Sequence, residues 1–196
     1  LHRIGMRVAD RVPAGSFDVE TLLKGETLVD LTKPVASPAG EFTADCKNGT
    51  LQVVTPRSEA LVIPSGGSLK GGLLAANGSE VFSTVFAGAL DDKTLADSRR
   101  VLILHLTDVK AAGQRLAMLG SRILMYNLGR PSPYLMRRGK VEIELVNRAP
   151  GTVVLRALDV NGKTLGDVPF TEKAGKIVFS ADPGVTGAFA YELLRR

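Results

Sequence analysis

The sequence predicts an all-β fold, an antiparallel β-sandwich of the jelly-roll or Ig-like kind with about a dozen short strands and at most one or two short helices. Short runs rich in Val, Ile, Leu and Thr are separated by turn residues, at spacings close to the roughly 8–12 residues typical of a sandwich. The 21 Gly and 10 Pro are spread along the chain, which indicates many turns. Repeated amphipathic segments of helical length, which parallel strands need as crossovers, are absent from the sequence.

The beginning of the chain differs from the rest. Residues 1–26 are predicted to be a lead-in from an upstream domain, followed by a single β-sandwich domain over 27–196. One short helix is expected over 18–24, because Ser16 can cap its start and Gly25 can end it. The first residues show neither an initiating Met nor the charged-then-apolar pattern of a secretion signal, so we expect either that they continue from a longer chain or that the start has been processed.

Two β-hairpins are predicted from Asn-Gly dipeptides, which suit the tight type I′ turn between antiparallel strands. The first joins residues 41–46 to 50–55, and the second joins 153–160 to 163–168. A third Asn-Gly turn precedes a strand expected over 81–87.

Further strands are bounded by Gly, Pro, Asn or charged turns. They are expected over 60–63, 101–106, 122–126, 140–146, 177–180 and 188–194. The strand over 140–146 alternates strictly, so its apolar residues should face the core and its polar residues should face water. The apolar set is Val141, Ile143 and Leu145, and the polar set is Lys140, Glu142 and Glu144. Residues 109–120 are assigned to a short helix or a long loop.

Charge and composition exclude several classes of function. The net charge is +5, but the basic doublets at 99–100, 137–138 and 195–196 lie far apart and are not interleaved with aromatic residues, so nucleic acid is not an expected partner. No apolar run reaches the roughly 18 residues needed to span a membrane. The glycine-rich stretch over 65–72 lacks the spacing of a phosphate-binding loop, and no cofactor is predicted.

No catalytic residue is predicted. The two histidines are His2, near the start, and His105, inside an apolar strand. Ser98, His105 and Asp108 supply the residue types of a catalytic triad, but the Gly-x-Ser-x-Gly turn that exposes such a serine is missing. We therefore expect His105 to be an ordinary strand residue.

The carboxylates give no clearer site. Glu142 and Glu144 should lie side by side on one strand face, whereas two acids that cleave a glycoside must flank the bond between them. Asp91, Asp92 and Asp97 are candidate ligands for a weak calcium site, but they lack the alternating oxygen ligands of a calcium loop, and an acidic turn is favoured. No other metal site is predicted.

The order and spacing of four segments resemble a known family. The segments are residues 49–60, 97–108, 154–163 and 191–193. In this respect the chain resembles the C-terminal β-sandwich domain that follows the TIM-barrel catalytic domain in secreted bacterial glycoside hydrolases of the β-galactosidase and agarase-like kind.

The resemblance implies a non-catalytic accessory domain that packs on the catalytic domain and shapes its substrate cleft. Its partner would be the upstream catalytic domain of the same polypeptide, and the fragment itself would not be an enzyme although the parent chain would hydrolyse glycosides. It also implies a secreted, periplasmic or cell-surface location. An exposed apolar patch should mark the side that faces the barrel.

Two other functions remain open. A stand-alone carbohydrate-binding or cell-surface adhesion module would have polysaccharide as its partner, but the chain has no Trp to stack on sugar rings and its three tyrosines are scattered. A free-standing hydrolase is the third reading, and it would depend on His105 or Glu142.

Overall fold

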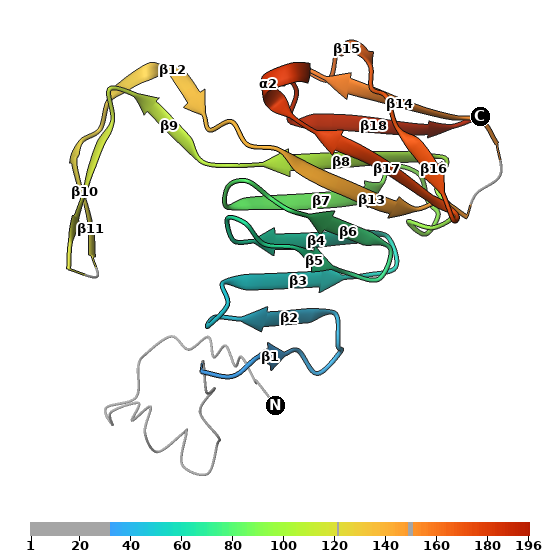
Figure 1. Cartoon of the computed structure of the whole chain (residues 1–196), viewed down its shortest axis with the longest axis horizontal. Coiled ribbons are helices and arrows are strands. Elements are labelled where there is room, and N and C mark those ends of the chain that lie inside the picture. The colour runs from blue at the N-terminus through green and yellow to red at the C-terminus, as the bar shows by residue number, and fades with distance from the viewer. Residues whose placement is uncertain (1–31, 121, 149–150) are drawn as a thin grey trace, which may run out of the picture.

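Two antiparallel sheets form the body of the protein in the computed structural model, which describes residues 32–120, 122–148 and 151–196 (Figure 1). The larger sheet has nine strands in the order β1-β2-β3-β4-β7-β8-β18-β14-β15. These strands are β1 (Val35–Ala36), β2 (Phe42–Asp45), β3 (Thr50–Val54), β4 (Ser58–Ile63), β7 (Ser83–Ala89), β8 (Arg100–Leu106), β18 (Ala190–Arg195), β14 (Val153–Leu158) and β15 (Thr164–Asp167).

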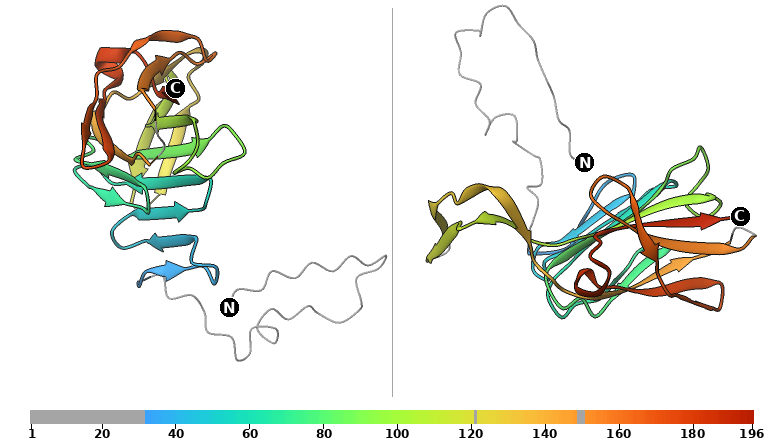
Figure 2. Two further views of the ribbon diagram at one scale, coloured as in Figure 1. Left: turned by 90° about the vertical axis from the view of Figure 1, so that its right-hand side faces the viewer. Right: turned by 90° about the horizontal axis from the view of Figure 1, so that it is seen from above.

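The smaller sheet has five strands in the order β16-β17-β13-β6-β5. They are β16 (Thr171–Lys173), β17 (Lys176–Ala181), β13 (Val141–Val146), β6 (Leu74–Asn77) and β5 (Leu69–Lys70). This sheet lies against β4 and the strands beyond it, while β1 to β3 continue the larger sheet past it (Figures 1 and 2). All residues of β2 and β3 are half-buried. The sandwich predicted from the sequence is confirmed.

The core lies between the two sheets and follows the period-2 pattern of their strands. In β13, Val141, Ile143 and Leu145 are fully buried, as the alternation predicts. Across the core, the rings of Phe179 on β17 and Tyr191 on β18 meet edge to face, with centroids 5.2 Å apart. Such a contact joins one sheet to the other and fixes how they stack.

The two predicted Asn-Gly hairpins are confirmed, because β2 pairs with β3 and β14 pairs with β15. The glycine of each turn has the positive φ that the turn needs, 66° at Gly49 and 80° at Gly162. The third Asn-Gly turn follows β6, and the next strand, β7, belongs to the opposite sheet, so this turn connects the two layers.

One short helix, α2 (Pro183–Thr186), is present in the described residues, and Asp182 caps it by accepting a 2.8 Å hydrogen bond from the N–H of Gly184. The expected helix over 18–24, its caps Ser16 and Gly25, and the lead-in over 1–26 all lie outside the described residues. The described part of the chain holds no helix long and apolar enough to cross a membrane.

Between β8 and β13 the chain leaves the body as two successive two-stranded ribbons (Figures 1 and 2). In the ribbon near the body β9 (Val109–Ala112) pairs with β12 (Arg130–Met136), and in the outer ribbon β10 (Arg115–Leu119) pairs with β11 (Arg122–Asn127). The short helix or long loop expected over 109–120 is therefore wrong. Its Ala, Gln, Leu and Met favour helix locally, but pairing with the following strands decides the structure.

Candidate functional site

The three residue types of a triad do not form one. His105 on β8 is fully buried, and neither ring nitrogen has a hydrogen-bond partner among the described residues. Burial lowers the pKa of His105 to about 4, so its ring is neutral near pH 7. The Ser98 hydroxyl donates to the carbonyl of Arg100 at 2.7 Å, and the Asp108 carboxylate lies 3.3 Å from the guanidinium of Arg137. Ser98 and Asp108 are thus each engaged in a separate local contact, and His105 is buried without a hydrogen-bond partner among the described residues.

Glu142 and Glu144 lie on the same face of β13, as expected from their spacing. Glu142 is exposed, and Glu144 accepts hydrogen bonds from the Lys176 ammonium at 2.7 Å and the Asn77 amide at 3.0 Å. The bond from Lys176 lowers the pKa of Glu144 despite its partial burial. Glu144 is therefore an ionised, paired carboxylate on a sheet face and lacks the raised pKa of a general acid.

The three acidic residues of the weak calcium hypothesis lie in the loop between β7 and β8. These are Asp91, Asp92 and Asp97. Asp91 accepts a 2.8 Å hydrogen bond from the N–H of Arg99, and Asp97 accepts one of 2.6 Å from the Thr94 hydroxyl. Asp92 lies 3.8 Å from the Arg57 guanidinium. No group of three or more His, Cys, Asp or Glu in the described residues lies close enough to hold a metal ion, so the loop offers no built site.

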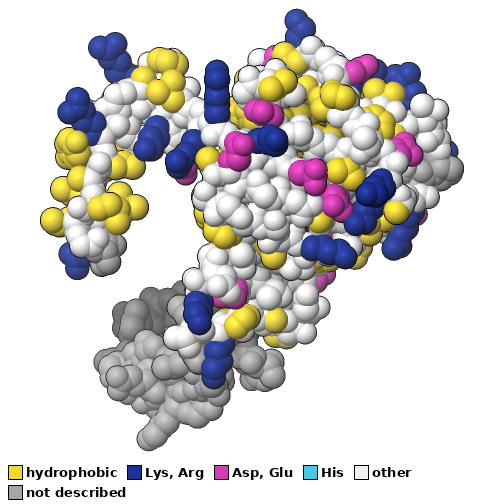
Figure 3. All heavy atoms as spheres, in the orientation of Figure 1, with side chains coloured by type: hydrophobic (Ala, Val, Ile, Leu, Met, Phe, Trp, Pro, Cys, Tyr) yellow, Lys and Arg dark blue, Asp and Glu magenta, His cyan; other side chains and the backbone are white. Residues whose placement is uncertain are grey.

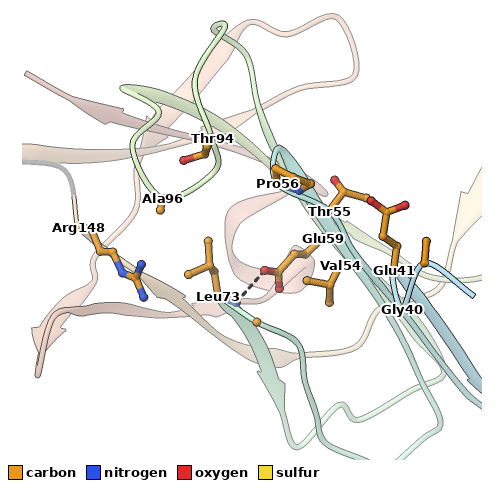
Figure 4. A pocket seen from close by; sticks show the side chains of 12 residues that line it. Gly40, Glu41, Val54, Thr55, Pro56, Glu59, Leu73, Thr94, Ala96 and Arg148 are labelled. Atoms are coloured by element: carbon orange, nitrogen blue, oxygen red, sulfur yellow. Dashed lines mark hydrogen bonds between the residues drawn. The ribbon is translucent and has the colours of Figure 1, made fainter. Parts of the chain in front are cut away.

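A pocket of about 480 Å³ opens beside β3 and β4, and Figure 4 shows it from close by. Among the described residues that line it, Glu41, Glu59 and Arg148 supply the charged groups, and none is aromatic. Glu59 is only 1% exposed, and its carboxylate accepts backbone hydrogen bonds from Leu73 at 2.7 Å and Leu74 at 3.0 Å. This carboxylate is committed to the backbone of the second sheet, and the pocket lacks the flat ring on which a sugar would stack.

Glu59 was not among the candidates predicted from the sequence, although its position in β4 predicts that its side chain is buried. It stands two and four residues before Leu61 and Ile63, so it lies on the same, inward face of β4. Alternation therefore predicts a buried glutamate, and a buried glutamate needs hydrogen-bond partners.

The main exposed apolar surface is on the two ribbons, which we call the arm and define as residues 109–138. Eleven of the seventeen large hydrophobic side chains exposed in the described chain belong to it. They are Val109, Leu116, Met118, Leu119, Ile123, Leu124, Met125, Tyr126, Leu128, Tyr134 and Leu135. Figure 3 shows hydrophobic and basic side chains together along the arm, which stands clear of the body. Apolar residues gathered in this way mark an interaction surface.

The outer ribbon has two different faces, because directly opposed residues of an antiparallel pair share one face. The apolar face, as we call it, carries two cross-strand pairs, Leu116 with Met125 and Met118 with Ile123. The mixed face carries Ala117 with Leu124 and Leu119 with Arg122. A fifth pair, Arg115 with Asn127, lies beyond a register shift. Over the other four pairs, one side of this ribbon is formed by large apolar side chains.

Within the part of the chain that the structure describes, no second layer covers either face of the arm. Every described residue of β10 and β11 is exposed, and none of the arm's residues belongs to the hydrophobic core cluster. An isolated two-stranded ribbon is at best marginally stable in water. Covering one large apolar side chain contributes about 1.5–3 kcal/mol, so a partner surface would stabilise the arm considerably.

The chain matches no family model, and comparisons with curated proteins and with solved structures also give no match. The resemblance to accessory domains of glycoside hydrolases therefore stays a prediction from the sequence. The arm is the described feature best built for a function, and sequence reasoning missed it because the apolar residues over 109–120 were not assigned to strands.

Proposed function

We propose that this chain is a non-catalytic β-sandwich accessory domain of a glycoside hydrolase, which packs on the catalytic domain and shapes its substrate cleft. The observation that carries the proposal is the arm, whose outer ribbon exposes all its described residues and carries an apolar face of two cross-strand pairs. A free sandwich domain gains nothing from such a projection, whereas a domain that docks on a neighbour needs one.

The contacts of the ionisable residues support a non-catalytic role. Among the described residues, the buried His105 has no hydrogen-bond partner that could make it a base, and Glu144 is held ionised by Lys176. Neither arrangement provides the pair of opposed carboxyl groups that glycoside hydrolysis uses. The chemistry is assigned to the catalytic domain.

The proposal is tested on the polypeptide encoded by the whole natural reading frame. We expect that polypeptide to hydrolyse a glycoside, and residues 1–196 alone to be inactive on the same substrate. Replacing arm residues 109–136 by a two-residue turn should lower turnover of the whole polypeptide. Turnover by residues 1–196 alone, or no glycosidase activity in the whole polypeptide, would contradict the proposal.

A carbohydrate-binding or adhesion module is separated by a second measurement. Residues 1–196 are mixed with insoluble polysaccharides such as cellulose, agarose and xylan, and the retained fraction is measured. An accessory domain that acts only by docking should stay in solution, because no described residue that lines its pocket is aromatic. Retention that survives in 0.5 M salt would favour the binding module instead.

A further inference from the structure

The arm also concentrates the positive charge of the protein. It contains six Lys and Arg and no Asp or Glu, whereas the other described residues hold fifteen basic and fifteen acidic side chains. The basic residues of the arm are Lys110, Arg115, Arg122, Arg130, Arg137 and Arg138. Of these six basic residues, only Arg137 forms an ion pair with another described residue, Asp108 at the base of the arm. The arm is therefore a cationic, apolar projection from a body of no net charge.

We propose that the arm seats its apolar face, formed by Leu116, Met118, Ile123 and Met125, in an apolar groove whose rim carries carboxylates, on another domain of the same polypeptide. This inference rests on the proposed function, because it places the groove on the catalytic domain. It adds which face docks and what chemistry receives it.

The composition of the arm matches the core of a protein interface. Interfaces are enriched in Met, Tyr and Arg and depleted in Lys, Glu and Asp. The arm has three Met, two Tyr and five Arg but a single Lys and no acid. Met side chains fit irregular apolar grooves, and Arg pairs with carboxylates through two parallel hydrogen bonds. A groove with an acidic rim satisfies both kinds of side chain.

A second copy of this chain fits the arm less well. Two arms would bring like charges together, and the body offers no excess of acidic side chains to offset them. A close approach of like charges disfavours such a pair.

A lipid surface also fits less well, because of where one arginine lies. Arg122 opens β11 and is paired with Leu119 at the end of β10, so it sits at the outer turn of the arm. Insertion of that turn into a bilayer would carry its charge toward the hydrocarbon, which is costly. A carboxylate on a protein groove removes this cost by pairing with it.

The inference is tested by photo-crosslinking in the whole natural polypeptide. A benzophenone amino acid is introduced at Met118 on the apolar face, and at Val160, which is 92% exposed on the body, as the matched control. We expect the Met118 probe to crosslink to residues of the same molecule outside 1–196, in a segment rich in apolar residues and flanked by Asp or Glu. The Val160 probe should give less than a tenth of that yield.

Charge reversal tests the acidic rim separately. The double change Arg122→Glu and Arg130→Glu should lower the Met118 crosslink at least fivefold at low salt, whereas Lys163→Glu on the body should leave it unchanged. Both sets of side chains are exposed, so folding is not at risk, and a thermal melt of each variant checks this. An unchanged yield in the arginine variant would overturn the acidic rim.

Other crosslinking outcomes overturn the inference. Isotope-labelled and unlabelled molecules are mixed, so a crosslink between two copies would show self-association. Vesicles of three parts phosphatidylcholine to one part phosphatidylglycerol are added in a parallel reaction, and crosslinking to lipid would show membrane docking. Absence of any crosslink from Met118 would show that the arm stays free.

The two proposals fail in different ways. If the whole polypeptide hydrolyses glycosides but the Met118 probe remains uncrosslinked, the docking inference falls and the proposed function stands. If the probe reaches an acidic-rimmed groove on a domain without glycosidase activity, the proposed function falls and the docking inference stands.

Discussion

The carboxylate of Glu59, on β4 of the larger sheet, accepts a 2.7 Å hydrogen bond from the backbone N–H of Leu73, which immediately precedes β6 of the smaller sheet. A second bond of 3.0 Å from Leu74 engages the other carboxylate oxygen. Gly71 approaches so closely that a methyl group on it would collide with this carboxylate. One buried acid thus ties β4 of the larger sheet to the start of β6 in the smaller sheet.

Glu59→Gln should destabilise the fold by about 1.5–3 kcal/mol, because one accepting oxygen becomes an amide that cannot accept from a backbone N–H. Urea unfolding followed by circular dichroism measures the free energy of unfolding. The matched control is Glu142→Gln, an exposed glutamate on β13 that should change stability by less than about 0.5 kcal/mol. Equal losses in the two variants would show that the Glu59 contacts contribute little.

Removal of the arm should leave the body folded. The N–H of Arg137 donates to the carbonyl of Asp108 at 2.8 Å, so these two residues are close enough for an Asn-Gly turn to replace residues 109–136 between them. No residue of the arm lies in the core cluster, and the free energy of unfolding should change by no more than about 1 kcal/mol. A loss above about 3 kcal/mol would mean that the arm belongs to the fold rather than to an interface.

The purified chain should not hydrolyse glycosides. Glu142 and Glu144 stand on one strand face, and a bond placed between them could not be attacked from opposite sides. Release of reducing sugar from a panel of polysaccharides measures this, with Glu142→Gln as the matched variant. If the purified chain hydrolyses a glycoside and Glu142→Gln abolishes that activity, the chain is a free-standing hydrolase, the third function considered above.

Sequence reasoning reached the sandwich because its signals are local. Asn-Gly turns set the backbone of both hairpins, and the alternation over 140–146 places Val141, Ile143 and Leu145 in the core. The arm was missed because residues 109–120 favour helix by propensity, and their strand state depends on partners further along the chain. Glu59 and its partners are about fifteen residues apart, a contact that depends on how the sheets stack.

The stability of the protein should fall below neutral pH because of His105. Burial holds the pKa of this ring at about 4 in the folded protein, below the 6.5 of a free histidine, and the charge of Asp182 raises it only in part. The unfolded chain therefore binds a proton first as the pH falls, so stability is full above pH 6.5 and is lost progressively toward pH 4. The loss reaches up to about 3 kcal/mol. Urea unfolding at pH 7 and pH 4.5 measures this loss, and His105→Leu should abolish most of the pH dependence. The variant should remain folded, because neither ring nitrogen has a hydrogen-bond partner among the described residues. An unchanged pH dependence in His105→Leu would assign the acid sensitivity to other groups.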